Sequence, residues 1–225
     1  MAKVKICGIT NLEDALCACK AGADAIGFIF YKKSPRFITP QEVRDIIGAL
    51  PQNILKVGVF VNSGEDYVKK IQHLCRLDML QFHGTESAQF CEKFRNYKII
   101  KAIRVKDAKS LAGIKNYRVY AFLFDTYSTG KFGGTARTFN WTLLKGLKEL
   151  GRPIFLSGGL NARNINKALK TVGPEWLDAS SSLESSPGRK DHRKIKKFIA
   201  AAKKEEVSIK HKTGPNNQKL PSFSF

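Results

Sequence analysis

Val4-Lys5-Ile6-Cys7-Gly8-Ile9-Thr10 joins a short apolar run to a glycine and then to the start of a helix-forming segment. Val4 and Ile6 alternate like the apolar side chains of a strand, and Thr10 with Glu13 three residues later predicts a capping box for the following helix. Cys7 therefore lies at a strand-to-helix turn. In parallel α/β proteins such turns form the catalytic face, although a lone buried cysteine often acts as a small apolar side chain.

The same strand-to-helix unit recurs along the chain to about residue 204. The predicted strands are Val4–Cys7, Ala25–Phe30, Leu55–Val61, Met79–His83, Lys98–Arg104, Arg118–Asp125, Pro153–Ser157 and Trp176–Ser180. The predicted helices are Leu12–Ala21, Pro40–Ala49, Glu65–Leu74, Ser87–Phe94, Asp107–Ile114, Trp141–Leu150, Ala162–Val172 and Arg189–Lys203. Successive strand ends are 23, 32, 21, 21, 21, 32 and 23 residues apart. Eight such units predict an α/β fold, a single (β/α)8 TIM barrel over residues 1–204, rather than an open doubly wound sheet.

Residues 205–225 differ from the rest of the chain in composition. They are rich in lysine and contain Gly-Pro-Asn-Asn and Pro-Ser without an apolar period. This composition predicts a basic, low-complexity, disordered tail.

Composition limits the class of protein. Hydrophobic residues make up 43% of the 225, enough for a sizeable core, and no run of about 18 apolar residues predicts a membrane span. Met1 runs almost directly into the first strand, which leaves no room for a signal peptide. We expect a soluble, uncleaved protein with no membrane partner.

The five cysteines and the other possible ligands show no metal-site spacing. Cys17 and Cys19 would point about 200° apart on a helix, a poor metal clamp. No histidine or carboxylate cluster has ligand spacing, so we expect neither a metal nor a cofactor. An odd set of free thiols favours the reducing cytoplasm.

The net charge of +20 is unusual and would suit a nucleic-acid partner. It is divided between +8 from Gly188 onward and +12 spread over the preceding residues. No RNA-binding aromatic motif or zinc-finger spacing accompanies it. We therefore expect an anionic small-molecule substrate and no specific nucleic-acid partner. We expect the protein itself to be a monomer or a homodimer.

A barrel would bring its strand ends to one mouth, where Cys7 would face Asp125. Asp125 follows the apolar run Val119–Phe124. A carboxyl group placed there is partly desolvated and can hold a proton as a general acid, although it could also cap a turn. Arg36, beside Pro35, presents a planar fork suited to a carboxylate, and His83 could contact a ligand, act as a second base or bond to a neighbouring loop.

Two loops carry the composition of a phosphate site. Glycines let backbone N–H groups approach a phosphate, and the loops after strands seven and eight form the usual phosphate site of this fold. The relevant residues are Gly158 and Gly159 in the first loop and Asp178, Ser180 and Ser181 in the second. The glycine-rich segment 130–135 could close over a bound substrate.

Taken together, these motifs resemble those of the phosphoribosylanthranilate isomerase family over nearly the whole barrel. The matching segments are Lys5–Thr10, Gly22–Ala25, Gly27–Phe30, Ser34–Arg36, Gly58–Asn62, Gln81–Gly84, Asp125, Gly133–Thr135, Phe139–Trp141, Leu156–Leu160 and Pro187–Asp191.

The resemblance implies an Amadori rearrangement of N-(5′-phosphoribosyl)anthranilate in tryptophan biosynthesis. It implies Asp125 as the general acid, Cys7 as the general base, Arg36 on the anthranilate carboxylate, and the Gly158-Gly159 and Ser180-Ser181 backbones on the phosphate. A free cysteine has a pKa of about 8.5. A small depression, from Lys5 or from the bound substrate, would leave a useful thiolate fraction near neutrality.

The chain departs from the family pattern at three positions. Ser182 stands where glycine is usual, which would crowd the phosphate or force an unfavourable backbone angle; Ala136 replaces a common glycine and Asn140 a usual aspartate. Weaker phosphate binding is the expected consequence. The alternative functions are a barrel isomerase acting on another phosphorylated aminoaldose, and a non-catalytic barrel that binds anionic polymers.

Overall fold

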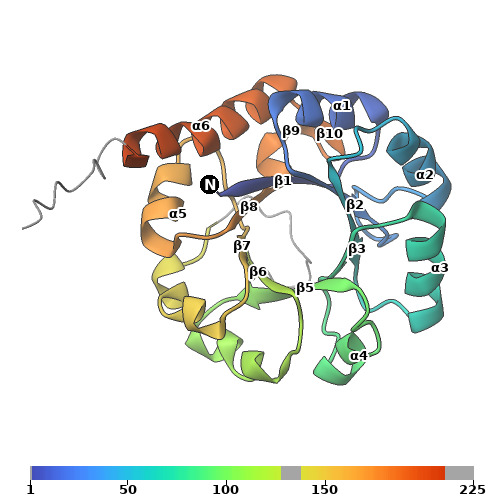
Figure 1. Ribbon diagram of the computed structural model, residues 1–225, viewed down its shortest axis with the longest axis horizontal. Coiled ribbons are helices and arrows are strands. Elements are labelled where there is room, and N and C mark those ends of the chain that lie inside the picture. The colour runs from blue at the N-terminus through green and yellow to red at the C-terminus, as the bar shows by residue number, and fades with distance from the viewer. Residues whose placement is uncertain (1, 128–137, 211–225) are drawn as a thin grey trace, which may run out of the picture.

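The computed structural model describes residues 2–127 and 138–210, with side chains as far as residue 204. Eight parallel strands close into a barrel in chain order, and the last pairs with the first (Figure 1). They are β1 (Lys3–Cys7), β2 (Ala25–Ile29), β3 (Leu55–Phe60), β4 (Met79–Phe82), β5 (Lys98–Val105), β6 (Ala121–Thr126), β7 (Ile154–Leu156) and β8 (Trp176–Ala179). The predicted (β/α)8 barrel is confirmed.

Helices surround the ring of strands (Figure 1). They are α1 (Leu12–Ala21), α2 (Pro40–Gly48), α3 (Glu65–Cys75), α4 (Ala88–Glu92), α5 (Ile165–Val172) and α6 (His192–Lys210). Alternation along each strand divides the apolar residues into two cores. Val4 and Ile6 pack in the layer between strands and helices, whereas Ala25, Phe155 and Trp176 fill the inside of the barrel.

Two of the predicted helices are wrong. The segments 107–114 and 141–150 form short 3-10 turns: η1 (Ala108–Leu111), η2 (Ile114–Asn116), η3 (Trp141–Leu144) and η4 (Leu147–Leu150). Gly113 and Gly146 separate the turns of each pair with φ of +73° and +84°. A left-handed glycine ends the helical path, so neither segment propagates into an α-helix.

The predicted capping box at Thr10 is also wrong. Asn11 caps α1, because its side chain accepts a hydrogen bond from the Asp14 N–H. The Thr10 hydroxyl instead donates to the Gly188 carbonyl, 178 residues away. A residue read as a local cap therefore makes a tertiary contact.

Pattern reading did not reveal a small hairpin after β8. The 3-10 turn η5 (Ser181–Leu183) leads into β9 (Glu184–Ser186), which pairs antiparallel with β10 (Arg189–Lys190). Between them Gly188 has a φ of +83°, which glycine adopts without strain. The predicted helix from Arg189 therefore starts only at His192.

The C-terminal region of the structure starts with α6, which runs to Lys210. Residues 205–210 of the predicted tail are thus helical. The rest of that tail, the glycine-rich segment 130–135 and Ala136 lie outside the described residues.

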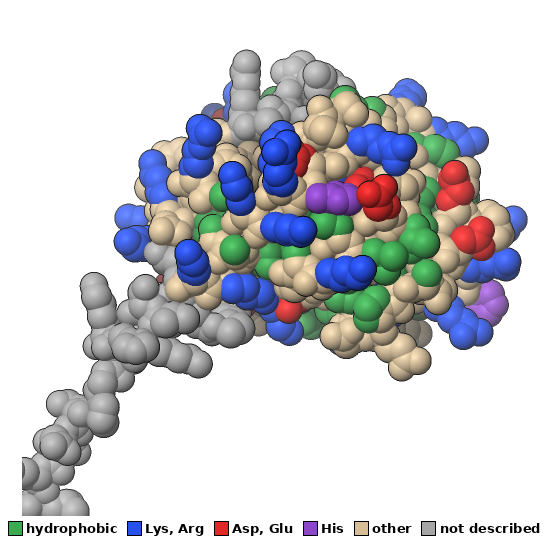
Figure 2. Space-filling view, turned by 90° about the horizontal axis from the view of Figure 1, so that it is seen from above, with side chains coloured by type: hydrophobic (Ala, Val, Ile, Leu, Met, Phe, Trp, Pro, Cys, Tyr) green, Lys and Arg blue, Asp and Glu red, His purple; other side chains and the backbone are tan. Residues whose placement is uncertain are grey.

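On the face of the molecule shown in Figure 2, basic side chains are distributed widely rather than gathered at one place. In Figure 2, Lys and Arg are spread over the whole face shown, among fewer acidic side chains. Over the described part of the chain, no helix combines the length and the apolar character needed to cross a membrane.

Candidate active site

A cavity of about 700 Å³ opens among the carboxyl ends of the barrel strands. All of the predicted site residues line it: Cys7, Arg36, His83, Asp125, Gly158, Gly159, Asp178, Ser180 and Ser181. They come from six different strand ends or the loops that follow them. The closed barrel thus brings together residues up to 174 positions apart in the chain, as the strand count predicted.

Cys7 ends β1 beside a buried lysine, Lys5, whose position in the fold was not predicted from the sequence. Lys5 lies two residues earlier on the same strand face, is fully buried, and donates from Nζ to Asp178 Oδ1 at 2.7 Å. Gly27 on β2 leaves room for both side chains. A Cβ at position 27 would lie 2.8 Å from the Cys7 Sγ and 3.2 Å from the Lys5 Cε.

Burial and charge oppose each other at Cys7. Burial raises the pKa of the Cys7 thiol above its ordinary value, although the Lys5 charge acts to lower it. Burial would lower the pKa of Lys5, but the charges of Asp178 and Cys7 outweigh it and raise that pKa. Lys5 is therefore a cation, and its charge acts on the thiol pKa in the direction considered from the sequence, although burial outweighs it in the protein without substrate.

Asp125 ends β6 and is held from two sides. Its Oδ1 accepts a hydrogen bond from the Thr126 N–H at 2.8 Å, and its Oδ2 lies 3.2 Å from the His83 Nε2. The Gln81 Nε2 lies 2.8 Å from the His83 Nδ1. With the Gln81 amide donating to Nδ1, the His83 Nε2–H donates to the Asp125 Oδ2. His83 therefore orients the carboxyl group as well as lining the cavity.

The loop after β7 has the conformation that glycine permits. Gly158 and Gly159 have φ of +84° and +68°, and a Cβ at position 158 would lie 2.3 Å from the Thr126 Oγ1. The Gly159 carbonyl accepts hydrogen bonds from Asn161 and Asn164. Among the described residues no acceptor contacts the N–H groups of Gly158 and Gly159, so these groups are available to an anion.

The loop after β8 contributes serine groups to the same wall. The Ser180 Oγ is buried and has no hydrogen-bond partner within the described ranges. The Gln81 Oε1, on the β4 side of the cavity, is likewise buried and has no hydrogen-bond partner among the described residues. Buried polar atoms without partners are unusual in folded proteins, so both atoms are candidates for contact with a polar ligand.

Ser182 does not have the strained backbone that was expected where glycine is usual. In the described chain only Asn62 and Arg76 combine a side chain with a positive φ. Ser182 lies in η5, and its hydroxyl donates to the Leu160 carbonyl. The side chain thus joins the loops after β7 and β8.

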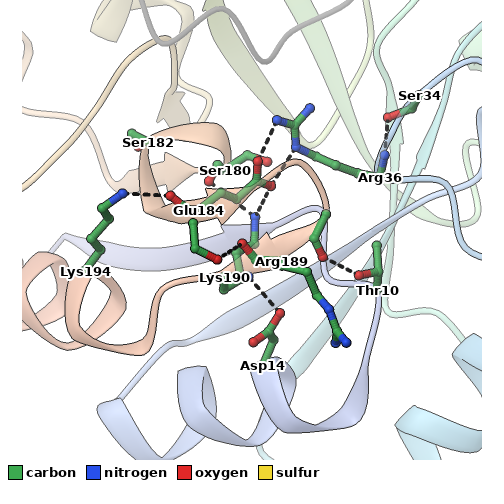
Figure 3. Close-up of polar contacts among 12 residues, drawn as sticks. Thr10, Asp14, Ser34, Arg36, Ser180, Ser182, Glu184, Arg189, Lys190 and Lys194 are labelled. Atoms are coloured by element: carbon green, nitrogen blue, oxygen red, sulfur yellow. Dashed lines mark hydrogen bonds and ion pairs between the residues drawn. The ribbon is translucent and has the colours of Figure 1, made fainter.

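Arg36 lies in the loop between β2 and α2 and projects to the cavity, but it is not alone. Its Nε and Nη2 each donate to one carboxylate oxygen of Glu184 at 2.7 Å (Figure 3). Glu184 was missed as a functional residue, although it lies only two residues after Ser182, one of the three departures from the family pattern. Nothing in the spacing indicated that this acid reaches an arginine 148 residues earlier.

In residues 2–127 and 138–204, no cluster of three or more His, Cys, Asp or Glu side chains is arranged to hold a metal ion.

Comparison with known proteins gives concordant matches. A family model described as N-(5′-phosphoribosyl)anthranilate (PRA) isomerase matches residues 4–201. The N-(5′-phosphoribosyl)anthranilate isomerase of Geotalea uraniireducens is 51% identical over 203 residues, which cover 90% of this chain and 99% of that protein. The corresponding protein of Thermotoga neapolitana is 43% identical over 204 residues, with 90% and 99% covered.

Solved structures of similar proteins share the fold closely. The phosphoribosyl anthranilate isomerase of Thermotoga maritima has a TM-score of 0.86 at 41% identity, covering 91% of this chain and all of that one. A crystal structure of such an isomerase in complex with reduced 1-(o-carboxyphenylamino)-1-deoxyribulose 5-phosphate has a TM-score of 0.83 at 40% identity, with the same coverage.

Proposed function

This chain belongs to the N-(5′-phosphoribosyl)anthranilate isomerase family, and we propose that Cys7 and Asp125 perform its reaction as general base and general acid. The enzyme converts N-(5′-phosphoribosyl)anthranilate to 1-(2-carboxyphenylamino)-1-deoxyribulose 5-phosphate, a step of tryptophan biosynthesis. This Amadori rearrangement turns an aminoaldose into an aminoketose of the same composition. It requires proton transfers and no external oxidant or reductant, and we expect no metal or cofactor.

Asp125 opens the sugar ring. It donates its proton to the furanose ring oxygen, the bond from that oxygen to C1′ breaks, and the anthranilate nitrogen lone pair forms a Schiff base with C1′. The hydrogen bonds from Thr126 and His83 keep the carboxyl group aimed in one direction. Such positioning lowers the entropic cost of the proton transfer.

Cys7 removes the proton from C2′. The electrons of that C–H bond form the C1′–C2′ double bond, and the C1′–N π electrons return to nitrogen, which gives an enolamine. The enolamine then tautomerises to the C2′ ketone: the C2′ hydroxyl loses its proton, the C2′–O double bond forms, and the C1′–C2′ π electrons take up a proton at C1′. Lys5 is the cation placed to balance the negative charge of the thiolate.

The remaining cavity residues bind the substrate between these two groups. Arg36 binds the anthranilate carboxylate, and the backbones of Gly158, Gly159, Ser180 and Ser181 bind the phosphate. We assign Asp178 to the sugar hydroxyls, because Lys5 holds only its Oδ1. His83, which contacts Asp125, lines the same cavity, and we assign it to the sugar as well.

The observation that carries the proposal is the presence of Cys7 and Asp125 on the wall of one cavity. Its test is conversion of N-(5′-phosphoribosyl)anthranilate by the purified protein in the presence of a metal chelator. We expect turnover in wild type and a kcat/KM for Arg36→Ala at least tenfold lower. An Arg36→Ala variant as active as wild type would favour a substrate without the anthranilate carboxylate.

Partners and location follow from the same chemistry. The partner is a small phosphorylated substrate, and we expect neither a specific nucleic acid nor a membrane. All five cysteines are free, which suits a reducing cytoplasm. For the oligomeric state we expect a monomer or a homodimer. The Thermotoga maritima isomerase is described as dimeric.

A further inference from the structure

Arg36 is held by a carboxylate on only one of its edges. Its Nε and Nη2 donate to Glu184, and this pair leaves the Nη1 free of Glu184, turned away from it in Figure 3. Arg36 lines the cavity, whereas Glu184 lies behind it and does not. The Glu184 side chain is only 5% exposed, so this ion pair is largely shielded from solvent.

A second cation contacts the same glutamate. The Lys190 Nζ lies 2.9 Å from the Glu184 Oε1 and 3.3 Å from the Ser180 carbonyl oxygen, and its side chain is fully buried. Lys190 does not line the cavity. Arg36, Glu184 and Lys190, called here the charge triad, combine two positive charges with one negative charge.

The charge triad is fixed in place by the hairpin β9–β10. The Lys190 N–H donates to the Asp14 Oδ2 at 2.9 Å, and Thr10 donates to the Gly188 carbonyl at the hairpin turn. The Lys194 Nζ donates to the Glu184 carbonyl at 2.7 Å. These contacts attach the hairpin to α1 and α6 and leave the triad little freedom to rearrange.

The net charge of the triad determines what Arg36 can attract. An arginine in a bidentate pair with one glutamate is electrically neutral as a unit, and a neutral unit attracts a second carboxylate weakly. Burial would raise the pKa of Glu184, but Arg36 and Lys190 outweigh it and lower that pKa, so Glu184 is charged. Burial lowers the pKa of Lys190, and the Glu184 carboxylate 2.9 Å from its Nζ acts in the opposite direction. The protonated Lys190 cancels the Glu184 charge, and the triad then presents one uncompensated positive charge at the cavity wall.

We propose that Lys190 is a specificity-determining residue: by neutralising Glu184 it leaves Arg36 one full positive charge for the substrate carboxylate. The proposal rests on the proposed contact between Arg36 and that carboxylate. Glu184 then fixes the direction of the guanidinium, and Lys190 supplies the charge balance without touching the substrate. Charges shielded from solvent are little screened by salt, so this balance acts strongly at the short distances involved.

The test compares two product analogues that differ only in the carboxylate. One is reduced 1-(o-carboxyphenylamino)-1-deoxyribulose 5-phosphate, and the other is its phenylamino counterpart, both titrated calorimetrically into wild type and Lys190→Met. We expect Lys190→Met to bind the carboxylated analogue about tenfold more weakly and the other analogue within about twofold of wild type. Lys190→Gln, which keeps a donor toward Glu184, repeats the test if Lys190→Met does not fold.

Two further variants separate charge from structure. Lys190→Met/Glu184→Gln restores a net charge of +1 and should recover most of the preference for the carboxylated analogue. Lys101→Met removes a comparably buried lysine, paired with Glu86 at 2.7 Å outside the cavity lining, and should leave the preference unchanged.

The possible failures are distinguishable. Equal weakening of both analogues by Lys190→Met, or no weakening, overturns the role of Lys190 while leaving the proposed contact of Arg36 standing. A wild type that does not prefer the carboxylated analogue overturns both.

Discussion

At the scale of single residues, Lys5 has the least expected environment. It is fully buried in a strand whose neighbours Val4 and Ile6 are apolar, and burying an ammonium group is costly unless a charged partner is present. Asp178 is that partner at 2.7 Å. Its position beside Cys7 is the basis for the proposed chemical role of Lys5, in addition to the structural pair.

The first prediction concerns the pH dependence of activity. Burial raises the pKa of Cys7, and only the deprotonated thiol can act as base. We therefore expect kcat/KM to be still rising at pH values above the pKa of a free cysteine. Lys5 acts to lower that pKa and Asp178 acts to raise it. Lys5→Met should therefore move the rising limb to higher pH and reduce kcat/KM at pH 7 by at least tenfold.

Measurement of kcat/KM from pH 6 to pH 10 in both proteins checks this prediction, and Lys101→Met serves as the matched buried-lysine control. If the rising part of the kcat/KM profile lies at the same pH in Lys5→Met as in wild type, Lys5 has only a structural role. Alkylation of Cys7 by iodoacetamide, followed over the same pH range by mass spectrometry, reports the thiolate without turnover.

Ser182 gives the second prediction at this scale. Its hydroxyl joins the two phosphate loops through the Leu160 carbonyl, so Ser182→Gly should raise KM about two- to fivefold instead of relieving crowding. Ser182→Ala separates loss of the hydroxyl from the added freedom of glycine. A KM below that of wild type in Ser182→Gly would restore the idea that the serine crowds the phosphate.

At the scale of elements, the loop after β7 gives a prediction about backbone conformation. Gly158→Ala should cost more stability than the roughly 1–2 kcal/mol of a left-handed alanine, because the new Cβ would lie 2.3 Å from the Thr126 Oγ1. It should also raise KM, since that loop lines the part of the cavity proposed to bind the phosphate. Urea denaturation and initial-rate kinetics measure the two effects.

Gly146→Ala is the matched control for this prediction. Gly146 has the same φ of +84°, but a Cβ there meets nothing within 4 Å. The Gly146→Ala variant should therefore lose only the stability that a left-handed alanine costs, and its KM should be unchanged. Equal losses of stability in the two variants would contradict the claim that close approach to Thr126 requires glycine at position 158.

Sequence patterns predicted the strands better than the connections, for a physical reason. Strands inside a closed barrel need apolar residues on both faces, and that requirement is visible in the chain. The turns η1 to η4 were taken for helices because their apolar spacing fits a helix, while the left-handed Gly113 and Gly146 interrupt the path. The hairpin β9–β10 leaves no periodic signal, since its strands have three and two residues.

At the scale of the whole molecule, barrel closure explains why the cavity could be predicted and its supporting charges could not. Strand counting is sufficient to bring Cys7, Asp125 and the phosphate loops to one mouth. It does not show that Glu184 reaches Arg36, or that Lys190 reaches Glu184, because these contacts depend on the path of an irregular hairpin. Similarly, Thr10 binds Gly188 only because the barrel brings the first and last units together.

The distribution of charge over the molecule yields a further prediction. Residues 211–225 lie beyond the segment 4–201 that matches the family, and they carry only two of the 39 Lys and Arg residues. Deletion of 211–225 should therefore leave kcat/KM within about twofold of wild type. A loss of activity above tenfold, measured with an unchanged melting temperature, would assign this segment a direct part in the reaction.

The central claim is that Cys7 and Asp125 form one acid–base pair across the mouth of the barrel. Its most direct test is the single-turnover rate of Cys7→Ala and of Asp125→Asn on saturating N-(5′-phosphoribosyl)anthranilate, with binding of the reduced product analogue measured in parallel. The proposed mechanism predicts that each rate falls by about a thousandfold or more while the analogue still binds. A near-wild-type rate in either variant would contradict it.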